Sequence, residues 1–231
     1  MTTPEFSQGS GLERVHSNGD ALPVVGEGAS SPEQEHYRIA SLRELNLGSE
    51  QDLSDYFRLL THPDNIEHFS NPPTDTENLK QKLVHDSTHA YLAENMLGEV
   101  VGGGGINDAP EGEHDHWLVK IVVDPKSQSR GLGKQLVAQL VEKAFSAKTP
   151  DGRDRTKIDA AVIRNVRGWE RMPRILEQLG FRPLHILLQQ VDVQEQGAIV
   201  KKPTERWELT KDDWVRKRRT ATIKNVIHPP L

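Results

Sequence analysis

The spacing of apolar and polar residues predicts that strands and helices alternate over most of the chain. Short runs rich in Val, Ile, Leu and Ala have the length of β-strands. They span residues 37–42, 90–94, 99–102, 117–123, 158–163 and 184–193. Apolar residues three and four positions apart predict helices over residues 49–60, 131–146 and 169–179, and a further helix after Thr74. This order predicts an α/β fold in which helices flank a mixed central sheet.

Three local features sharpen this outline. The run at 117–123 is apolar on both faces, so we expect it to be a central strand. Thr74 and Glu77 have the spacing of a capping box, which favours Thr74 as the N-cap of its helix. Residues 102–105 are four glycines, which indicate a close backbone approach or a bend at the end of a strand.

The two ends of the chain differ in composition from its middle. Residues 1–35 hold six acidic residues and one arginine but few large apolar ones, so burial cannot offset the entropy of ordering. We expect a disordered acidic tail there, and a folded domain over residues 36–195. Residues 196–231 are expected to be a C-terminal extension that is locally basic, because residues 201–224 hold nine basic and four acidic residues. A short helix is expected over residues 210–219.

Composition excludes several classes of chemistry. The chain has no cysteine, which rules out disulfides, thiolate metal sites and a cysteine nucleophile. Its net charge of -5 does not favour nucleic-acid binding. The sequence shows neither a secretory leader nor an apolar run of the roughly 18 residues needed to span a bilayer. We therefore expect a soluble cytoplasmic protein without a membrane partner, and a nuclear location stays open.

The segment after the predicted central strand has the features of a phosphate site. The strand ends near Asp124, a short loop follows, and Gly131 and Gly133 open the long helix. The free N–H groups and the dipole of a helix N-terminus favour an anion, and glycine lets a phosphate approach the backbone. Arg130 and Lys134 add positive charge. A tight strand-to-helix turn with incidental cations is the alternative interpretation.

Two common phosphate loops do not fit this segment. A Walker A loop needs a glycine where Gln128 stands and Ser or Thr where Gln135 stands. A dinucleotide fingerprint needs a glycine where Leu136 stands. The run Gln128-Ser129-Arg130-Gly131-Leu132-Gly133 instead matches the Gln/Arg-x-x-Gly-x-Gly/Ala signature of the GNAT N-acetyltransferase superfamily, which this chain resembles.

Three more motifs resemble that family, in the family's order along the chain. They are the hairpin-like Gly98-Glu99-Val100-Val101-Gly102, Asn165 just after a strand, and Leu179-Gly180-Phe181 after a helix. The resemblance covers about residues 36–195. It implies a splayed central sheet of the acyl-CoA N-acyltransferase type, with acetyl-CoA as co-substrate.

The resemblance also implies which residues bind acetyl-CoA. Backbone N–H groups of the loop would hold the pyrophosphate, and the preceding strand would pair with the pantetheine arm, one of its N–H groups stabilising the oxyanion. The residues implied are Gln128, Arg130, Gly131, Gly133 and Lys134 in the loop, and Ile121, Val122 and Val123 in the strand. Asn165 would line the cofactor near the split between the two central strands.

The residues for proton transfer depart from the family's pattern. Leu176 stands where a tyrosine usually protonates the leaving thiolate, and Trp117 stands where many relatives carry a glutamate. His116 is one candidate base, because histidine titrates near neutral pH. Glu99 is a rival base. Another group or water is left to protonate the thiolate.

Other charged clusters carry less weight. His85 and His89 have helical ligand spacing, with His114 and His116 as potential neighbours, but no His-Glu-x-x-His motif accompanies them and we expect no metal site. The basic run at 216–219 is expected to be a solvated helix end rather than a contact to RNA or to an acidic partner. Four charges give only weak, salt-sensitive binding.

Together these features predict an N-acetyltransferase that moves acetyl from acetyl-CoA to a primary amine by direct attack. The acceptor would be a small-molecule or peptide amine, and the sequence specifies neither its identity nor the oligomeric state. The missing tyrosine and glutamate keep open an alternative, a non-catalytic acyl-CoA-binding sensor or interaction module. A third hypothesis is a partner-binding protein that acts through its tails.

Overall fold

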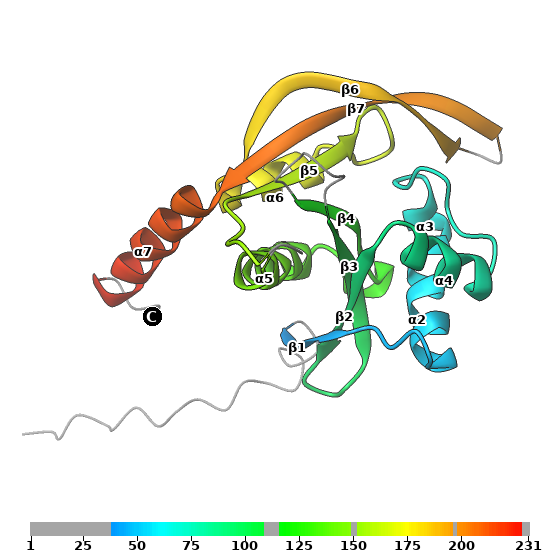
Figure 1. Cartoon of the computed structure of the whole chain (residues 1–231), viewed down its shortest axis with the longest axis horizontal. Coiled ribbons are helices and arrows are strands. Elements are labelled where there is room, and N and C mark those ends of the chain that lie inside the picture. The colour runs from blue at the N-terminus through cyan, green and yellow to red at the C-terminus, as the bar shows by residue number, and fades with distance from the viewer. Residues whose placement is uncertain (1–37, 109–115, 149–151, 196–197, 228–231) are drawn as a thin grey trace, which may run out of the picture. The chain divides into compact units, whose positions relative to one another are not determined.

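Seven strands in the described part of the chain form one mixed sheet (Figure 1). The computed structural model describes residues 38–108, 116–148, 152–195 and 198–227. The sheet order is β1-β2-β3-β4-β5-β7-β6, and all neighbouring strands are antiparallel except β4 and β5. The strands are β1 (Ile39–Glu44), β2 (Thr88–Asn95), β3 (Val100–Asn107), β4 (His116–Val123), β5 (Lys157–Ile163), β6 (Arg182–Glu195) and β7 (Ala198–Thr210). The mixed α/β fold predicted from the sequence is confirmed.

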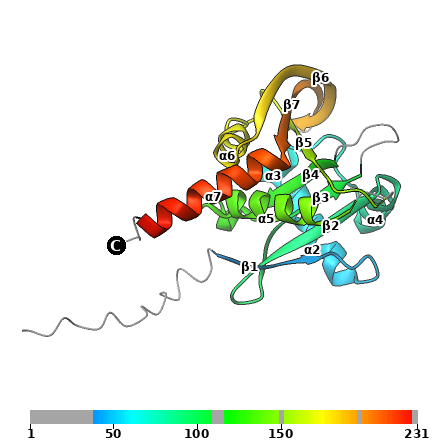
Figure 2. The same ribbon diagram turned by 60° about the vertical axis from the view of Figure 1, so that its left-hand side comes forward.

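Helices cover both faces of this sheet (Figures 1 and 2). On one face, α5 (Leu132–Ser146) and α6 (Arg171–Leu179) bury an apolar cluster that includes Leu136, Leu140 and Ile158. On the other face, α2 (Glu50–Thr61) and α4 (Thr76–His85) bury a second cluster around Tyr56 and Leu92. The remaining helices are the short α3 (Pro63–Ile66), the 3-10 turn η1 (Pro125–Ser127) and α7 (Lys211–Ile227).

The C-terminal segment requires a correction. Residues 198–210, expected to lie in an extension outside the domain, form β7, which pairs with β5 on one side and β6 on the other. The domain boundary expected at residue 195 therefore falls within a hairpin of the sheet. The short helix expected over residues 210–219 is α7, which continues to Ile227. The tail expected over residues 1–35 lies outside the described residues.

The N-terminus of α4 differs from the expected capping box. Asp75 is the N-cap, and its Oδ1 accepts a hydrogen bond from the Asn78 backbone N–H at 2.7 Å. The hydroxyl of Thr74 donates to Asp75 Oδ2 at 3.3 Å instead of capping the helix. A carboxylate at the N-cap also interacts favourably with the helix dipole. Asp75 is therefore a better N-cap than Thr74, which precedes it.

The four glycines lie inside β3 rather than at its end, and they allow close packing on both sides of the sheet. A Cβ at Gly103 would lie 2.9 Å from Tyr56 Cε2, and one at Gly104 would lie 2.7 Å from Leu140 Cδ1. Of the two structural expectations for this run, close backbone approach is therefore confirmed. The glycines let α2 and α5 pack directly against the strand that supports β4.

Candidate functional site

The two central strands separate after a short parallel stretch. β4 and β5 pair only from His116 to Leu118 and from Ile158 to Ala160, although β4 continues to Val123. A bulge places two β4 residues opposite Gly104, and one of them, Lys120, has a φ of 51°. A bulge increases twist and bends its strand. The main chain at the end of β4 is therefore paired with β3 on one side and not with β5 on the other.

The loop after β4 leaves the start of α5 open. Asp124 caps η1, and the chain then passes through left-handed conformations at Ser129 (φ 66°) and Gly131 (φ 82°). Gly131 is the N-cap of α5, and no side chain among the described residues caps this helix end. The N–H groups of the first helical turn have no partner within a helix, so they point outward with the positive end of the dipole. Arg130 and Lys134 are exposed beside them.

Gln128 holds the loop in place with its side chain. Its Nε2 donates to Asn65 Oδ1 at 3.0 Å and to the Val123 carbonyl at 3.2 Å. Asn65 is buried and donates to the Leu59 and Val123 carbonyls at 2.9 and 3.3 Å. The Gln128 N–H donates to the Pro125 carbonyl at 3.3 Å, so this N–H is already engaged within the loop.

Gly133 lets α5 approach α6 and β4. A Cβ at this position would lie 3.3 Å from Ile175 Cδ1 and 3.9 Å from Val123 Cγ2. At Gly131, by contrast, a Cβ would meet nothing within 4 Å, but the backbone conformation disfavours other residues. Gly133 therefore serves packing, while Gly131 shapes the open helix end.

The opposite wall of the opening begins where β5 ends. Asn165 follows β5, is exposed and has a φ of 62°, and its carbonyl accepts from Lys202 Nζ at 3.0 Å. The chain then turns into α6, whose first residue, Arg171, donates from Nη1 to Gln128 Oε1 at 3.3 Å. The structure thus brings the predicted loop, the end of β4 and the segment of Asn165 to the same end of the split between the strands.

The candidate bases are placed differently. The backbone of His116 pairs with Ile158 at the start of β4, and its side chain lies outside the described residues. Glu99 is exposed just before β3 and accepts from Asn95 Nδ2 at 2.8 Å. Glu99 precedes β3, which pairs with β4 on the edge away from β5.

Leu176 of α6 stands where the family usually has a catalytic tyrosine. Leu176 is fully buried in the core beneath α6. Tyr56 donates to the Lys120 carbonyl at the bulge, at 3.1 Å, but it is fully buried, and burial raises the pKa of its phenol well above the usual range. Tyr56 therefore supports the bulge and is not suited to transfer a proton.

His68, a histidine that the sequence analysis did not single out, lies close enough to Arg171 to be affected by its charge. His68 follows α3, and its N–H donates to the Asn65 carbonyl at 2.9 Å. Burial lowers the pKa of His68; the charge of Glu67 opposes this shift, and the charge of Arg171 adds to it. Two residues later, Ser70 forms an isolated antiparallel bridge with Val193 of β6. The position of His68 follows from these contacts in the folded chain and not from the sequence around it.

Two further places lie away from the split. Among the described residues, no group of three or more His, Asp or Glu side chains is placed to hold a metal ion. His89 Nδ1 lies 3.3 Å from Glu44 Oε1, and His114 lies outside the described residues.

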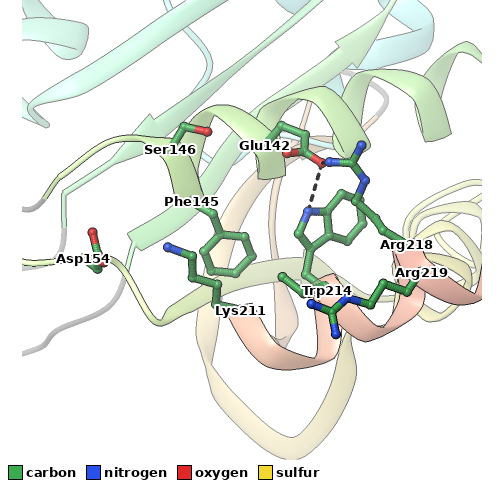
Figure 3. A pocket seen from close by; sticks show the side chains of 9 residues that line it. Glu142, Phe145, Ser146, Asp154, Lys211, Trp214, Arg218 and Arg219 are labelled. Carbon is green, nitrogen blue, oxygen red and sulfur yellow. Dashed lines mark hydrogen bonds and ion pairs between the residues drawn. The ribbon is translucent and has the colours of Figure 1, made fainter.

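A hollow of about 890 Å³ lies between α5 and α7, where Phe145 and Trp214 face it (Figure 3). It adjoins the C-terminal end of α5, roughly 20 Å along the helix from the loop.

The residues at the split suit acetyl-CoA as a bound co-substrate. The donor set is an uncapped helix N-terminus with exposed Arg130 and Lys134, which matches a diphosphate. The end of β4, unpaired with β5, offers alternating N–H and C=O groups, which match the amides of an extended pantetheine arm. Both parts lie at the same end of one strand, in the order in which they are joined in coenzyme A.

The split sheet beside an open helix N-terminus has the arrangement of the acyl-CoA N-acyltransferase-like fold predicted from the sequence. The model of the acetyltransferase (GNAT) family matches residues 51–152, which include β3, β4, the loop and α5. This match identifies residues 51–152 as a region of the GNAT acetyltransferase family.

Solved structures share the fold at low sequence identity. A spermidine N-acetyltransferase from Vibrio cholerae, in complex with CoA and spermine, matches with a TM-score of 0.59 and 16% identity, over 76% of this chain and 97% of that one. A ribosomal-protein-S5-alanine acetyltransferase from Vibrio fischeri matches with a TM-score of 0.53 and 18% identity, over 75% and 93%. No curated protein matches the sequence significantly. Among the described residues, no helix is long and apolar enough to cross a bilayer.

Proposed function

We propose that this protein is an N-acetyltransferase that moves the acetyl group of acetyl-CoA to a primary amine by direct attack. The observation that carries the proposal is the short pairing of β4 with β5 beside the uncapped start of α5. The backbone of Ile121, Val122 and Val123 would pair with the pantetheine arm. The first turn of α5, with Gly131, Gly133, Arg130 and Lys134, would hold the diphosphate.

The chemistry needs few protein groups. The free amine nitrogen attacks the thioester carbonyl carbon, a C–N bond forms, the C–S bond breaks, and coenzyme A leaves as a thiolate. An N–H group near the end of β4 would stabilise the charge on the carbonyl oxygen. The acceptor ammonium must lose one proton before attack, its nitrogen loses a second as the amide forms, and the thiolate must gain one. With Leu176 buried in the core, water would supply the proton to the thiolate.

His68 is our preferred proton acceptor, with His116 and Glu99 as the alternatives. It lies between Asn65, which binds the end of β4 through Val123, and Ser70, which contacts β6. Its lowered pKa keeps the imidazole neutral near pH 7, and a neutral imidazole can take a proton from an ammonium group. The side chain of Gln128 would hold the loop in position, and Asn165 would line the pantetheine arm from the β5 side.

The acceptor is proposed to be an aliphatic or peptide amine. The two structural neighbours described above are named for spermidine and for an alanine of ribosomal protein S5, so both belong to this chemical class. At 16% and 18% identity these neighbours share the fold and specify no single acceptor.

Release of coenzyme A from acetyl-CoA tests the proposal. The protein would be assayed with spermidine, a peptide with N-terminal alanine, a lysine peptide and an amino sugar, with thiol release as readout. At least one amine should raise the rate well above hydrolysis without an amine. Tight binding of acetyl-CoA without amine-dependent release would favour the alternative, an acyl-CoA-binding sensor.

A further inference from the structure

A guanidinium from the wall opposite the loop reaches across the split. Arg171 belongs to α6, which follows β5, whereas Gln128 belongs to the loop that follows β4. The 3.3 Å hydrogen bond from Arg171 Nη1 to Gln128 Oε1 therefore joins the two sides where the strands have separated. Arg171 is exposed, so a ligand can reach its guanidinium.

The turn before α6 directs this side chain. Gly168 has a φ of 71°, and a Cβ there would lie 3.5 Å from Arg171 Nε and 3.7 Å from Cζ. The Arg171 N–H donates to the Gly168 carbonyl at 3.2 Å. The guanidinium therefore lies back over its own turn, toward the loop, rather than extending along α6.

The described hydrogen-bond partner of the Arg171 guanidinium is a neutral amide. In the ranges that the structure describes, its polar side-chain contact is the neutral amide of Gln128, and no acidic side chain pairs with it. Its partner Gln128 lies three residues before Gly131, the N-cap of α5, and Arg130 and Lys134 are exposed at that positive helix end. The charge of Arg171 also acts on His68. Several positive groups thus converge on one place, which favours a multiply charged anion.

We propose that Arg171 forms the second wall of the diphosphate site and binds a phosphate oxygen of acetyl-CoA opposite the first turn of α5. This inference rests on the proposed function, because it assigns a further residue to the same co-substrate. A phosphate is a stronger partner for a guanidinium than the Gln128 amide, so the bond to Gln128 would be exchanged for a charge-assisted one. Arg171 would then hold the co-substrate between the two walls of the split.

Calorimetry on Arg171→Gln tests this role. The variant and the wild type would be titrated with acetyl-CoA and with acetyl-pantetheine, which carries the same thioester arm but no phosphate. We expect Arg171→Gln to weaken acetyl-CoA binding about tenfold, the scale of one charge-assisted contact, and to leave acetyl-pantetheine binding unchanged. Arg174→Gln is the matched control, since Arg174 is exposed one turn later on α6. Arg171→Lys should recover part of the affinity, because it keeps the charge but not the planar fork.

Three outcomes would overturn the proposal. An equal loss for both ligands would mean that Arg171 only positions Gln128 and the loop. Unchanged acetyl-CoA binding in Arg171→Gln would mean that the guanidinium does not contact the phosphates. If the folded wild type bound neither ligand, the proposed function would fail as well, so the two failures are distinguishable. Thermal melting of each variant would verify that the fold is intact.

Discussion

At the scale of single residues, buried carboxylates and amides hold neighbouring segments of the fold together. Asp52 accepts two hydrogen bonds from Arg43, at 2.6 and 3.0 Å, and one from the Asn46 N–H at 2.9 Å. It thereby joins β1, the following loop and α2. Asn65 plays the same part between α3 and the end of β4. Such polar side chains fix loops that apolar packing alone would leave free to shift.

The Asp52 network predicts a dependence of stability on pH. The Arg43 hydrogen bond is the largest cause of the lowered pKa of Asp52, so this carboxylate stabilises the fold at any pH above its unfolded pKa of about 3.9. That stability is lost as pH falls through the lower folded pKa. Asp52→Asn should cost about 2 kcal/mol at pH 7 and flatten the loss below pH 4. Urea unfolding across pH would measure it, with the exposed Glu50→Gln as control.

Substitution of His68 should change the pH dependence of catalysis. If His68 takes the acceptor proton, kcat/KM of the wild type falls in acid as the imidazole becomes charged, below its usual pKa of about 6.5. His68→Gln should lower kcat/KM by about 10²-fold and remove that acid limb, with acetyl-CoA binding unchanged. His85→Gln, an exposed site at the end of α4, is the control. An acid limb retained in His68→Gln would shift the role to His116 or to water.

The sequence predicted the residues of the site only where they are contiguous. The loop at 128–133 was identified because its spacing is local, and the structure places that loop, β4 and Asn165 together at the split. His68 and Arg171 were missed because they approach the loop through contacts between distant segments. No short-range pattern encodes such an approach. Their roles, like those of the loop residues, stay predictions.

At the scale of elements, β3 is the strand that allows the site to form. Its glycines let Tyr56 reach across from α2 to the bulge in β4, where its hydroxyl binds the Lys120 carbonyl. The bulge in turn bends the end of β4 at the place where β5 no longer pairs with it. The packing of α2 therefore supports the geometry of the split without contributing a reactive group.

A methyl group on β3 tests this support. In Gly103→Ala the Cβ would lie 2.9 Å from both Tyr56 Cε2 and the Tyr91 carbonyl oxygen, closer than atoms pack, so the ring or the strand must shift. We expect a loss of about 1–3 kcal/mol in the free energy of unfolding. Gly48→Ala is the comparison, since its Cβ would meet only the flexible Asn46 side chain, at 3.3 Å. An equal, small loss in both would contradict the account of β3.

Most elements were predicted from periodicity, but β7 was not. Trp207 and Leu209 are buried on one face of β7 and alternate with the less buried Arg206 and Glu208. The preceding Lys201, Lys202 and Pro203 obscure this short alternation. The polar first half pairs with β6 beyond the end of β5, where a strand needs no apolar faces. Composition therefore favoured an extension, and tertiary pairing made it a strand.

At the scale of the molecule, the candidate site and the hollow between α5 and α7 lie at opposite ends of α5. The opening between β4 and β5 lies beside the N-terminus of α5, whereas the hollow of Figure 3 adjoins the other end of this helix. There, Trp214 donates to Glu142 at 3.0 Å and packs α7 against the sheet cluster. The hollow is thus part of how α7 docks, and we propose that acetyl transfer takes place at the split.

The most direct test of the central claim is calorimetric titration of acetyl-CoA into the wild type, Gly131→Trp and Gly152→Trp. Gly131 and Gly152 have the same φ of +82°, and a Cβ added at either would meet open space, so both substitutions impose similar backbone strain. Only Gly131 lies at the start of α5, where an indole would cover the helix N-terminus. The account predicts binding to the wild type and to Gly152→Trp, and its loss in Gly131→Trp. Binding retained in Gly131→Trp, or absent from the folded wild type, would contradict it.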